Sequence, residues 1–388
     1  METLILGWYV LVETGSALML TVFGALQYLG TLIAPMFGVV GDRIGHRNLL
    51  AGMRSVYTAL ASTLMAFAFA RLLEPFLVLV IAGLSGLVRP SDMGMRAALV
   101  AETMPVEHLA SAASISRTTS DSARVAGALA GAGLFAALGM GPAYLVVSGF
   151  YAAGLVLTLC VPRRCFAPPA PGSAAGAVRR PSAWRELGEG IAYIWRTPHL
   201  LAAMWLAFLV NLTAFPFSGG LLPYVARELY GSDQTGLGYL AASFAGGAFA
   251  GSVVLSFVSS RIRPARMMIL FGAAWYAMLL VFAQVQNLAG GMLALFVTGF
   301  VQSFSMVPLT VLLLRTAHEK FRGRVMGVRM MAIYSLPLGL LGAGALIDRI
   351  GFAATATAYA AVGLACVAAI GLRWRAQLWS AEAPGNAR

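Results

Sequence analysis

The sequence predicts an all-α, polytopic membrane protein, and three observations support this. Hydrophobic residues make up 59% of the 388 residues, charged residues make up only 11%, and the mean hydropathy is +0.80. Soluble domains carry about 25% charged residues, so this composition cannot cover a water-facing surface of ordinary polarity. The apolar residues also gather in runs that reach about 20 residues, the length of a membrane span. These observations exclude a soluble enzyme and a soluble binding module.

Eleven long apolar runs follow one another along the chain. They cover residues 17–40, 50–70, 75–98, 111–137, 142–160, 199–225, 237–258, 267–286, 292–314, 325–347 and 353–372. An earlier run, Leu4–Val12, is too short to cross a hydrocarbon core of about 30 Å. With Glu2 ahead of it, this run also lacks the features of a cleavable signal peptide. We expect it to be the second half of a first helix that begins upstream of this sequence.

The basic residues predict the orientation of these spans. Of the 27 Lys and Arg residues, 18 lie in every second connection, at 41–49, 161–198, 259–266, 315–324 and 373–388. The alternate connections hold only Arg71, Arg227 and Arg349. Because basic loops stay in the cytoplasm, the first set is predicted to be cytoplasmic, with the protein in a bacterial inner membrane. The net charge of +12 therefore indicates the lipid bilayer as the partner, and not a nucleic acid.

The chain divides into four parts: two helix bundles at 1–160 and 199–372, a cytoplasmic linker at 161–198 and a cytoplasmic tail at 373–388. Within the linker, apolar residues from Trp184 to Trp195 recur at helical spacing, opposite charged residues. This pattern favours an amphipathic helix along the membrane surface, and the alternative is a cytoplasmic extension of the next span.

The two bundles repeat short motifs. Gly131-Ala132-Gly133 recurs as Gly342-Ala343-Gly344, and Arg43-Ile44 recurs as Arg261-Ile262. The separations are similar, so the repeats indicate a duplicated six-helix unit, an arrangement that many secondary transporters share.

One loop motif resembles a known family. Residues 38–47 read GVVGDRIGHR and resemble the loop motif G-x-x-x-D-R-x-G-R-R of the major facilitator superfamily, with His46 in place of one basic residue. Residues 187–198 also resemble the segment before helix seven in bacterial macrolide- and enterobactin-efflux-like facilitators. The resemblance implies a fold of two six-helix bundles and a gating role for six residues of the motif: Gly38, Gly41, Asp42, Arg43, Gly45 and Arg47. It also implies that Asp42 meets the start of helix eleven, near Arg324, together with Arg96 or Arg89 of helix four.

Charged residues inside the apolar runs form two groups. Arg89, Asp92 and Arg96 share one helix face, and so do Arg117, Asp121 and Arg124. Each such charge costs at least about 2.5 kcal/mol at the bilayer centre, so lipid-facing placement is disfavoured. We expect the groups to face each other or an aqueous cavity. Two roles remain open, a structural network and a site for protons or substrate, and Asp121 is the better candidate for protonation.

The second bundle offers uncharged candidates for a substrate cavity: Asn211, Tyr224, Gln302, Ser303 and Tyr334. For each of them, packing or a helix–helix hydrogen bond is an equally good interpretation. A mainly apolar cavity with a few polar groups suits lipophilic or amphiphilic molecules. The histidine and cysteine positions indicate no metal site, and no phosphate-binding glycine-rich loop is present, so we expect no cofactor and no enzymatic activity.

These observations together predict a secondary active transporter that works by alternating access. We expect a monomeric, proton-coupled antiporter that exports a small lipophilic or amphiphilic molecule resembling a drug or a siderophore. The alternatives are an importer or facilitator of a small metabolite, a transporter-derived sensor and a membrane-embedded enzyme.

Overall fold

The computed structural model describes residues 1–31, 36–37, 40–41, 44–103, 109–161, 183–258, 263–318 and 321–379. This part of the chain consists of helices and turns and contains no strand, which confirms the all-α class. Seven of its helices are long and apolar enough to span a membrane: Met140–Cys160, Pro198–Gly220, Gln234–Phe257, Pro264–Gln284, Leu288–Thr316, Arg324–Ile350 and Phe352–Arg373. The chain is therefore a multi-pass membrane protein.

The first bundle consists of α1 (Glu2–Thr14), α2 (Ala17–Leu26), the short 3₁₀ helix η1 (Leu29–Thr31), α4 (His46–Phe69), α5 (Pro75–Thr103), α6 (Leu109–Leu138) and α7 (Met140–Cys160). Gly15 ends α1 in the left-handed conformation, with φ 62°, and the Ser16 hydroxyl caps α2 by accepting from the amide of Met19. The helices α4 and α7 pack along each other, and α5 packs against α4.

The linker contributes α8 (Ala183–Arg196). The second bundle follows with α9 (Pro198–Thr213), the π-helical turn η3 (Pro216–Gly220), α10 (Leu222–Tyr224), the π-helical turn η4 (Val225–Leu229), α11 (Gln234–Val258), α12 (Pro264–Gln284), α13 (Leu288–Thr316), α14 (Arg322–Ala332), α15 (Ser335–Ile350), α16 (Phe352–Arg373) and α17 (Arg375–Trp379). The central helix of this bundle is α13, because both α11 and α12 pack against it.

Three apolar runs do not form continuous α-helices, and in the first of them, at 17–40, α2 gives way to a turn and to η1 within the described residues. The run at 199–225 changes from α9 into η3 close to Pro216, and the run at 325–347 is interrupted by a turn at Ile333 and Tyr334. A proline ring clashes with the carbonyl group four residues earlier, and Pro337 stands four residues after Ile333. The interruptions at 199–225 and 325–347 therefore follow from the positions of prolines, which a hydropathy profile does not take into account.

The two bundles meet through glycine contacts along two helix pairs, α2 with α15 and α6 with α11. A Cβ atom on Gly344 of α15 would lie 2.1 Å from the Thr21 hydroxyl oxygen and 3.1 Å from the Leu18 Cα of α2. A Cβ atom on Gly238 of α11 would lie 2.2 Å from Ala132 Cβ of α6. The repeated Gly-Ala-Gly motif thus lies at both interfaces, because Ala132 and Gly344 belong to its two copies.

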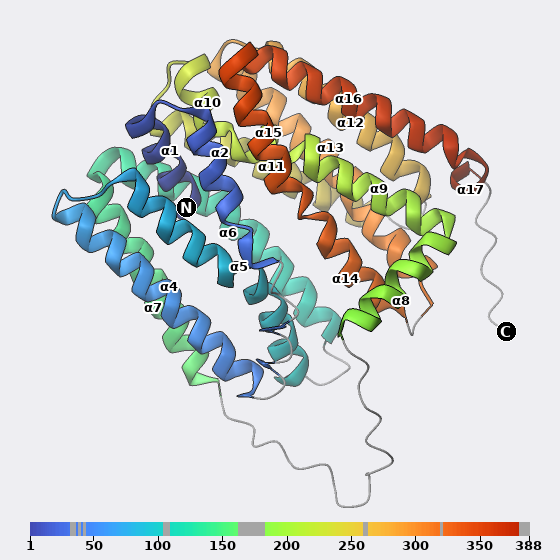
Figure 1. Ribbon diagram of the computed structural model, residues 1–388, viewed down its shortest axis with the longest axis horizontal. Helices are drawn as coiled ribbons and strands as arrows, with labels where there is room; N and C mark the ends of the chain where they lie inside the picture. The colour runs from blue at the N-terminus through green and yellow to red at the C-terminus, as the bar shows by residue number, and fades with distance from the viewer. Residues whose placement is uncertain are drawn as a thin grey trace, which may run out of the picture.

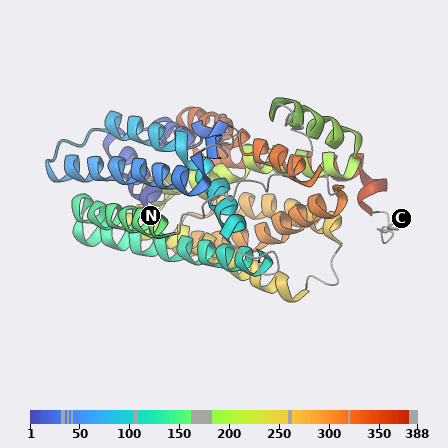
Figure 2. The same cartoon turned by 90° about the horizontal axis from the view of Figure 1, so that it is seen from below.

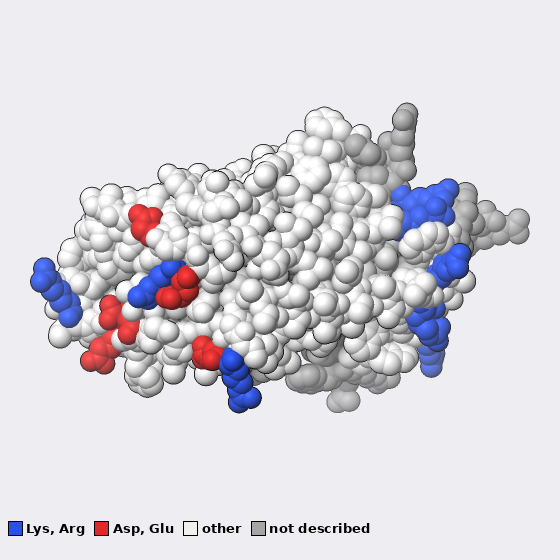
Figure 3. All heavy atoms as spheres, turned by 90° about the horizontal axis from the view of Figure 1, so that it is seen from above, with Lys and Arg blue, Asp and Glu red and all other residues white. Residues whose placement is uncertain are grey.

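Figure 1 shows the two bundles close together around α1, α2, α10 and α15 and diverging toward α4 and α7 on one side and α9, α16 and α17 on the other. Seen from below, α8 lies across the outside of the second bundle, where it contacts α14 (Figure 2). Figure 3 shows Lys and Arg side chains gathered at the end of the second bundle beside α17, whereas acidic and basic groups are mixed at the opposite end. This distribution agrees with the predicted cytoplasmic side.

Candidate functional site

The loop motif leads into α4, and the structure describes three of its six predicted residues. Gly38, Asp42 and Arg43 lie outside the described residues. Gly45 precedes α4 with φ +87°, a conformation that favours glycine. A Cβ atom on Gly41 would lie 3.0 Å from the Met95 sulfur of α5, so the motif packs directly against that helix.

Arg47 joins the start of α4 to the end of α7. Its Nε donates to the Val161 carbonyl oxygen at 2.6 Å, and its Nη2 donates to the Leu159 carbonyl oxygen. The last carbonyl groups of a helix carry partial negative charge, so a guanidinium group stabilises this end of α7. In this structure, Arg47 therefore has a structural contact within the first bundle.

The three charged residues of α5 do not form a single group. Arg96 Nη2 lies 2.7 Å from Asp92 Oδ2, one helical turn away, and the Arg96 side chain is 46% exposed. Arg89 turns instead toward α1, where its Nη2 lies 3.5 Å from Glu2 Oε2. The expected group on α5 is thus divided between an intrahelical pair and a contact between helices.

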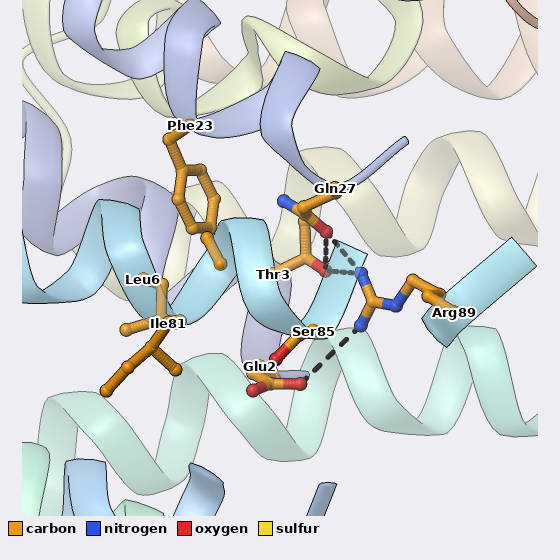
Figure 4. A pocket seen from close by; sticks show the side chains of 9 residues that line it. Glu2, Thr3, Leu6, Phe23, Gln27, Ile81, Ser85 and Arg89 are labelled. Atoms are coloured by element: carbon orange, nitrogen blue, oxygen red, sulfur yellow. Dashed lines mark hydrogen bonds and ion pairs between the residues drawn. The ribbon is translucent and has the colours of Figure 1, made fainter. Parts of the chain in front are cut away.

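A polar cluster surrounds the Glu2–Arg89 pair in the middle of the first bundle (Figure 4). Arg89 Nη1 donates to the Thr3 hydroxyl oxygen at 3.2 Å and to the Gln27 side-chain oxygen. The Tyr151 hydroxyl of α7 donates to Glu2 Oε2 at 2.5 Å. Side chains from α1, α5 and α7 and from the end of α2 therefore meet at one carboxylate and one guanidinium group.

Apolar side chains border this cluster, which remains partly open to the surroundings. The hollow around it holds about 250 Å³ of empty space, much of it open to the surroundings, and its other lining residues are Leu6, Phe23, Ile81, Ala82 and Ser85. The Glu2 side chain is 14% exposed and that of Arg89 is 39% exposed. A carboxylate in such surroundings depends on its charged partner and hydrogen bonds for stability, so a change in its protonation changes the local packing energy.

Tyrosine side chains extend the polar cluster toward α4. The Tyr57 ring stacks on Tyr151, with centroids 5.5 Å apart. The hydroxyl groups of Tyr57 and Tyr144 are buried and have no hydrogen-bond partner among the described residues. Buried hydroxyl groups usually have a partner, so these two are exceptions beside the polar cluster.

Sequence reasoning missed Glu2 as a site residue. Its position ahead of the apolar run Leu4–Val12 argued against a signal peptide, but an acid at the edge of an apolar run is also a candidate for a charged partner inside the bundle. Gln27 provided a second signal, since an uncharged polar residue within the run 17–40 needs a partner inside the bundle.

The second charged group, on α6, is described only at Arg124, because the side chains of Arg117 and Asp121 lie outside the described residues. Arg124 lines a second cavity, which lies between the bundles and holds about 430 Å³ of empty space, part of it open to the surroundings. Its other lining residues come from α11 and α13: Ala245, Ala248, Phe249, Ser252, Gln302, Ser303, Met306 and Val307. The structure thus brings the candidates Gln302 and Ser303 together with Arg124.

The other three candidates of the second bundle lie elsewhere. Asn211 donates to the Ala207 carbonyl oxygen of its own helix at 2.8 Å. Tyr224 stacks on Phe352, and burial raises the pKa of its phenol, with Glu228 and Asp348 adding to the rise. Tyr334 lies half-buried at the turn between α14 and α15. None of them lines either of the two cavities described above.

Within the described residues, no group of three or more His, Cys, Asp or Glu side chains is placed to hold a metal ion. The side chains around the two cavities offer a carboxylate that can bind a proton and hydrogen-bond donors that can recognise a polar or charged ligand.

Comparisons with known proteins agree with this architecture. The family described as Major Facilitator Superfamily matches residues 3–340 and 204–385. The nucleoside transporter NupG superposes with a TM-score of 0.66 at 16% identity, covering 96% of this chain and 94% of that one. The E. coli fucose:proton symporter FucP superposes with a TM-score of 0.58 at 14% identity, covering 97% of each chain. At these identities the solved structures show a shared fold. The comparison with curated proteins found no match.

Proposed function

Because this chain belongs to the Major Facilitator Superfamily, we propose that it is a proton-coupled secondary transporter that exports a lipophilic or amphiphilic small molecule by alternating access. The observation that carries the proposal is the Glu2–Arg89 pair, a largely buried acid and its partly exposed counter-ion, which joins α1 to α5 within the first bundle. Ionisable groups at such positions are expensive, and they often belong to proton pathways in transporters.

The contacts between the bundles support alternating access. At the end opposite the predicted cytoplasmic side, Arg227 Nη1 of η4 donates to the Leu11 carbonyl oxygen of α1 at 2.8 Å. Among the described residues, α14, which lies toward the cytoplasmic side, makes its main contacts with α8, α9 and α13, and α5, which reaches that side at its C-terminal end, makes its main contacts within the first bundle. We infer that this arrangement is open toward the cytoplasm and closed toward the outside.

Helix α1 connects the proposed proton site to the outer contact. Glu2 lies at its first turn and Leu11 in its last turn, and nine residues of α-helix span about 14 Å. A proton on Glu2 removes the charge that attracts Arg89, which weakens the tie between α1 and α5. We infer that α1 then shifts relative to α5 and changes its contact with η4, so that proton binding alters closure on the outside.

The composition of the cavity between the bundles supports an amphiphilic substrate. Arg124 and Gln302 are its long polar side chains, while Phe249, Met306 and Val307 supply apolar surface. A sugar-like molecule needs a hydrogen-bonding partner for each of several hydroxyl groups, which this lining does not offer. Export is the direction we propose, and import of a small metabolite is the alternative.

Inside-out vesicles with a respiration-driven pH gradient test the proposal. Amphiphilic compounds are added singly, and the gradient is followed with a pH-sensitive dye. For a proton-coupled exporter, a transported compound partly collapses the gradient in vesicles that contain the protein, and Glu2→Gln vesicles show no collapse. Vesicles without the protein control for passive leakage.

Two results would contradict the proposal. The first is that no compound affects the gradient while right-side-out vesicles take up a labelled nucleoside or labelled fucose, which would indicate import. The second is transport that proceeds equally well with and without the gradient, which would indicate a facilitator.

A further inference from the structure

The cavity between the bundles holds an arginine side chain that the proton-coupling scheme does not use. Ala128 follows Arg124 by one turn and Ala132 by two turns, on the same face of α6. This face packs against Gly238 of α11. The cavity begins where that close contact ends, and α11 and α13 form its other walls. Of the described lining residues, Arg124 is the one that the first bundle contributes.

Two groups in this cavity have unused hydrogen-bonding capacity. Among the described residues, neither the Arg124 guanidinium nor the Gln302 amide has a hydrogen bond or an ion pair. The serine hydroxyl groups beside them are already engaged. Ser303 Oγ donates to the Ala248 carbonyl oxygen at 2.7 Å, and Ser252 Oγ donates to Ser303 Oγ at 3.4 Å.

The electrostatics of the cavity are one-sided. Among the described residues that line it, none is acidic and Arg124 is the charged one. A cationic ligand would therefore meet repulsion here, whereas an anion would relieve the charge of an arginine held at membrane depth.

The donor set also has a chemical preference. A guanidinium group presents a planar array of N–H donors that matches two oxygens of a carboxylate, sulfonate or phosphate, and an amide NH₂ adds further donors. The apolar part of the ligand would contact Phe249, Met306 and Val307.

We propose that this cavity binds the oxyanion of an amphiphilic anion between Arg124 of the first bundle and Gln302 of the second. The inference rests on the proposed transport function and specifies its substrate class. Such a ligand contacts both bundles at once, so its binding favours arrangements in which α6 and α13 approach each other.

The test is a pair of probes that differ in charge and share one ring system, naphthalene-2-sulfonate and naphthalene-2-sulfonamide. Binding is measured on the purified protein in an uncharged detergent, from the rise in unfolding temperature at increasing probe concentration. Wild-type protein is expected to bind the sulfonate at least about tenfold more tightly than the sulfonamide. Arg124→Gln should remove this difference, and Arg124→Lys should retain part of it.

Controls separate the site from general charge effects. Arg71→Gln removes an exposed charge from the outer connection between α4 and α5. This variant should bind both probes as the wild-type protein does. Asp121→Asn removes the acid one turn before Arg124 on α6 and should leave sulfonate binding intact or tighten it. If Arg124→Gln does not fold, the comparison of the two probes on wild-type protein still decides the charge preference.

A lipid phosphate has the same oxyanion chemistry as the proposed substrate, so binding is repeated in phosphatidylcholine nanodiscs with and without phosphatidylglycerol. Equal sulfonate affinity in both is expected. Loss of sulfonate binding in the discs with phosphatidylglycerol would assign the site to lipid and overturn the proposal. Equal affinity of wild-type protein for both probes would also overturn it. If the sulfonate binds through Arg124 but no compound collapses a pH gradient, the transport proposal fails and the anion site stands.

Discussion

Glu189 of α8 and Arg324 of α14 form an ion pair, with 2.6 Å between Oε2 and Nη1. The Tyr193 ring, one turn along α8, stacks on Phe321 with centroids 4.5 Å apart. The linker helix is thus held against the first turn of α14, the place where the family resemblance expects Asp42 to meet helix eleven. We infer that Glu189 and Asp42 compete for this end of α14 in the two states of the transport cycle.

Glu189→Gln is predicted to favour closure of the cytoplasmic side, because it removes the charge by which α8 attracts Arg324 at the start of α14. The Glu189 side chain is 41% exposed, so the pair is worth at most about 1 kcal/mol, or about a fivefold change in the ratio of states. Spin labels at Asn48→Cys and Ala376→Cys, with the native cysteines replaced by serine, report the distance across this side. The charge exchange Glu189→Arg with Arg324→Glu should restore the wild-type distances. If it does not, the ion pair does not control the ratio of the two states.

Asp42→Asn is predicted to act in the opposite direction. Without its charge, Asp42 no longer attracts the N-terminal end of α14, an interaction worth about 0.3–1 kcal/mol at an exposed site and up to about 2 kcal/mol when partly buried. The same pair of labels should show a larger population with the cytoplasmic side open, in a protein that still inserts and folds. Unchanged distances together with wild-type transport would reduce the motif to a marker of topology.

Arg227→Gln is predicted to open the outer side. The substitution removes the charged donor that reaches the Leu11 carbonyl oxygen from the other bundle. Labels at Leu72→Cys and Gln286→Cys should then report a longer mean distance across the outer side. Glu228→Gln is the matched control, because it removes only the 3.5 Å ion pair beside this contact and leaves the Arg227 donor in place. Equal effects of both substitutions would contradict a specific role for the hydrogen bond.

Gly238→Val and Gly344→Val are predicted to keep the bundles apart at the outer side. At Gly344 the obstacle is partly backbone, since the added Cβ would lie 3.1 Å from Leu18 Cα, and backbone yields less readily than a side chain. Both variants should insert but lose transport, with the outer labels far apart. Gly133→Ala is the control, because nothing lies within 4 Å of a Cβ atom placed there, and it should transport normally. Wild-type transport by either valine variant would show that the close contact is dispensable.

Much of the fold follows from the sequence because a membrane span must satisfy all of its backbone hydrogen bonds internally, so an apolar run of sufficient length becomes a helix. This logic predicted α7, α12, α13 and α16 well. It did not predict the π-helical turns η3 and η4 or the turn at Ile333–Tyr334, which depend on proline positions and on packing against other helices.

The candidate site was less predictable than the fold. Helical spacing placed Arg89, Asp92 and Arg96 on one face of α5, but it could not show that Arg89 finds its partner on α1, far away in the sequence. Gln302 and Arg124 belong to different bundles, and only the packing of α6 against α11 brings them to one cavity. Partners between distant segments require the tertiary arrangement, which local spacing does not contain.

Glu2→Gln is predicted to abolish gradient-driven transport while sparing exchange of substrate without a gradient. Glutamine keeps the size of the side chain and an oxygen that can accept from Tyr151 and from Arg89, so the cluster should remain assembled. What it loses is the ability to bind and release a proton, which coupling requires. Transport with an imposed pH gradient and counterflow without one, measured in proteoliposomes with the same amphiphile, separate the two functions.

Asp121→Asn is the matched comparison for this prediction, since Asp121 is the acid that the sequence favoured for protonation and it lies on α6 in the same bundle. If Glu2 carries the coupling proton, Asp121→Asn should retain at least part of the gradient-driven transport, whereas Glu2→Gln retains only counterflow. The reverse pattern would move the coupling site to Asp121 and leave Glu2 as a structural counter-ion of Arg89. Loss of counterflow in Glu2→Gln, in a protein that still folds, would likewise assign Glu2 to the structure of the bundle, because a neutral side chain of the same shape would then have failed to hold α1 against α5.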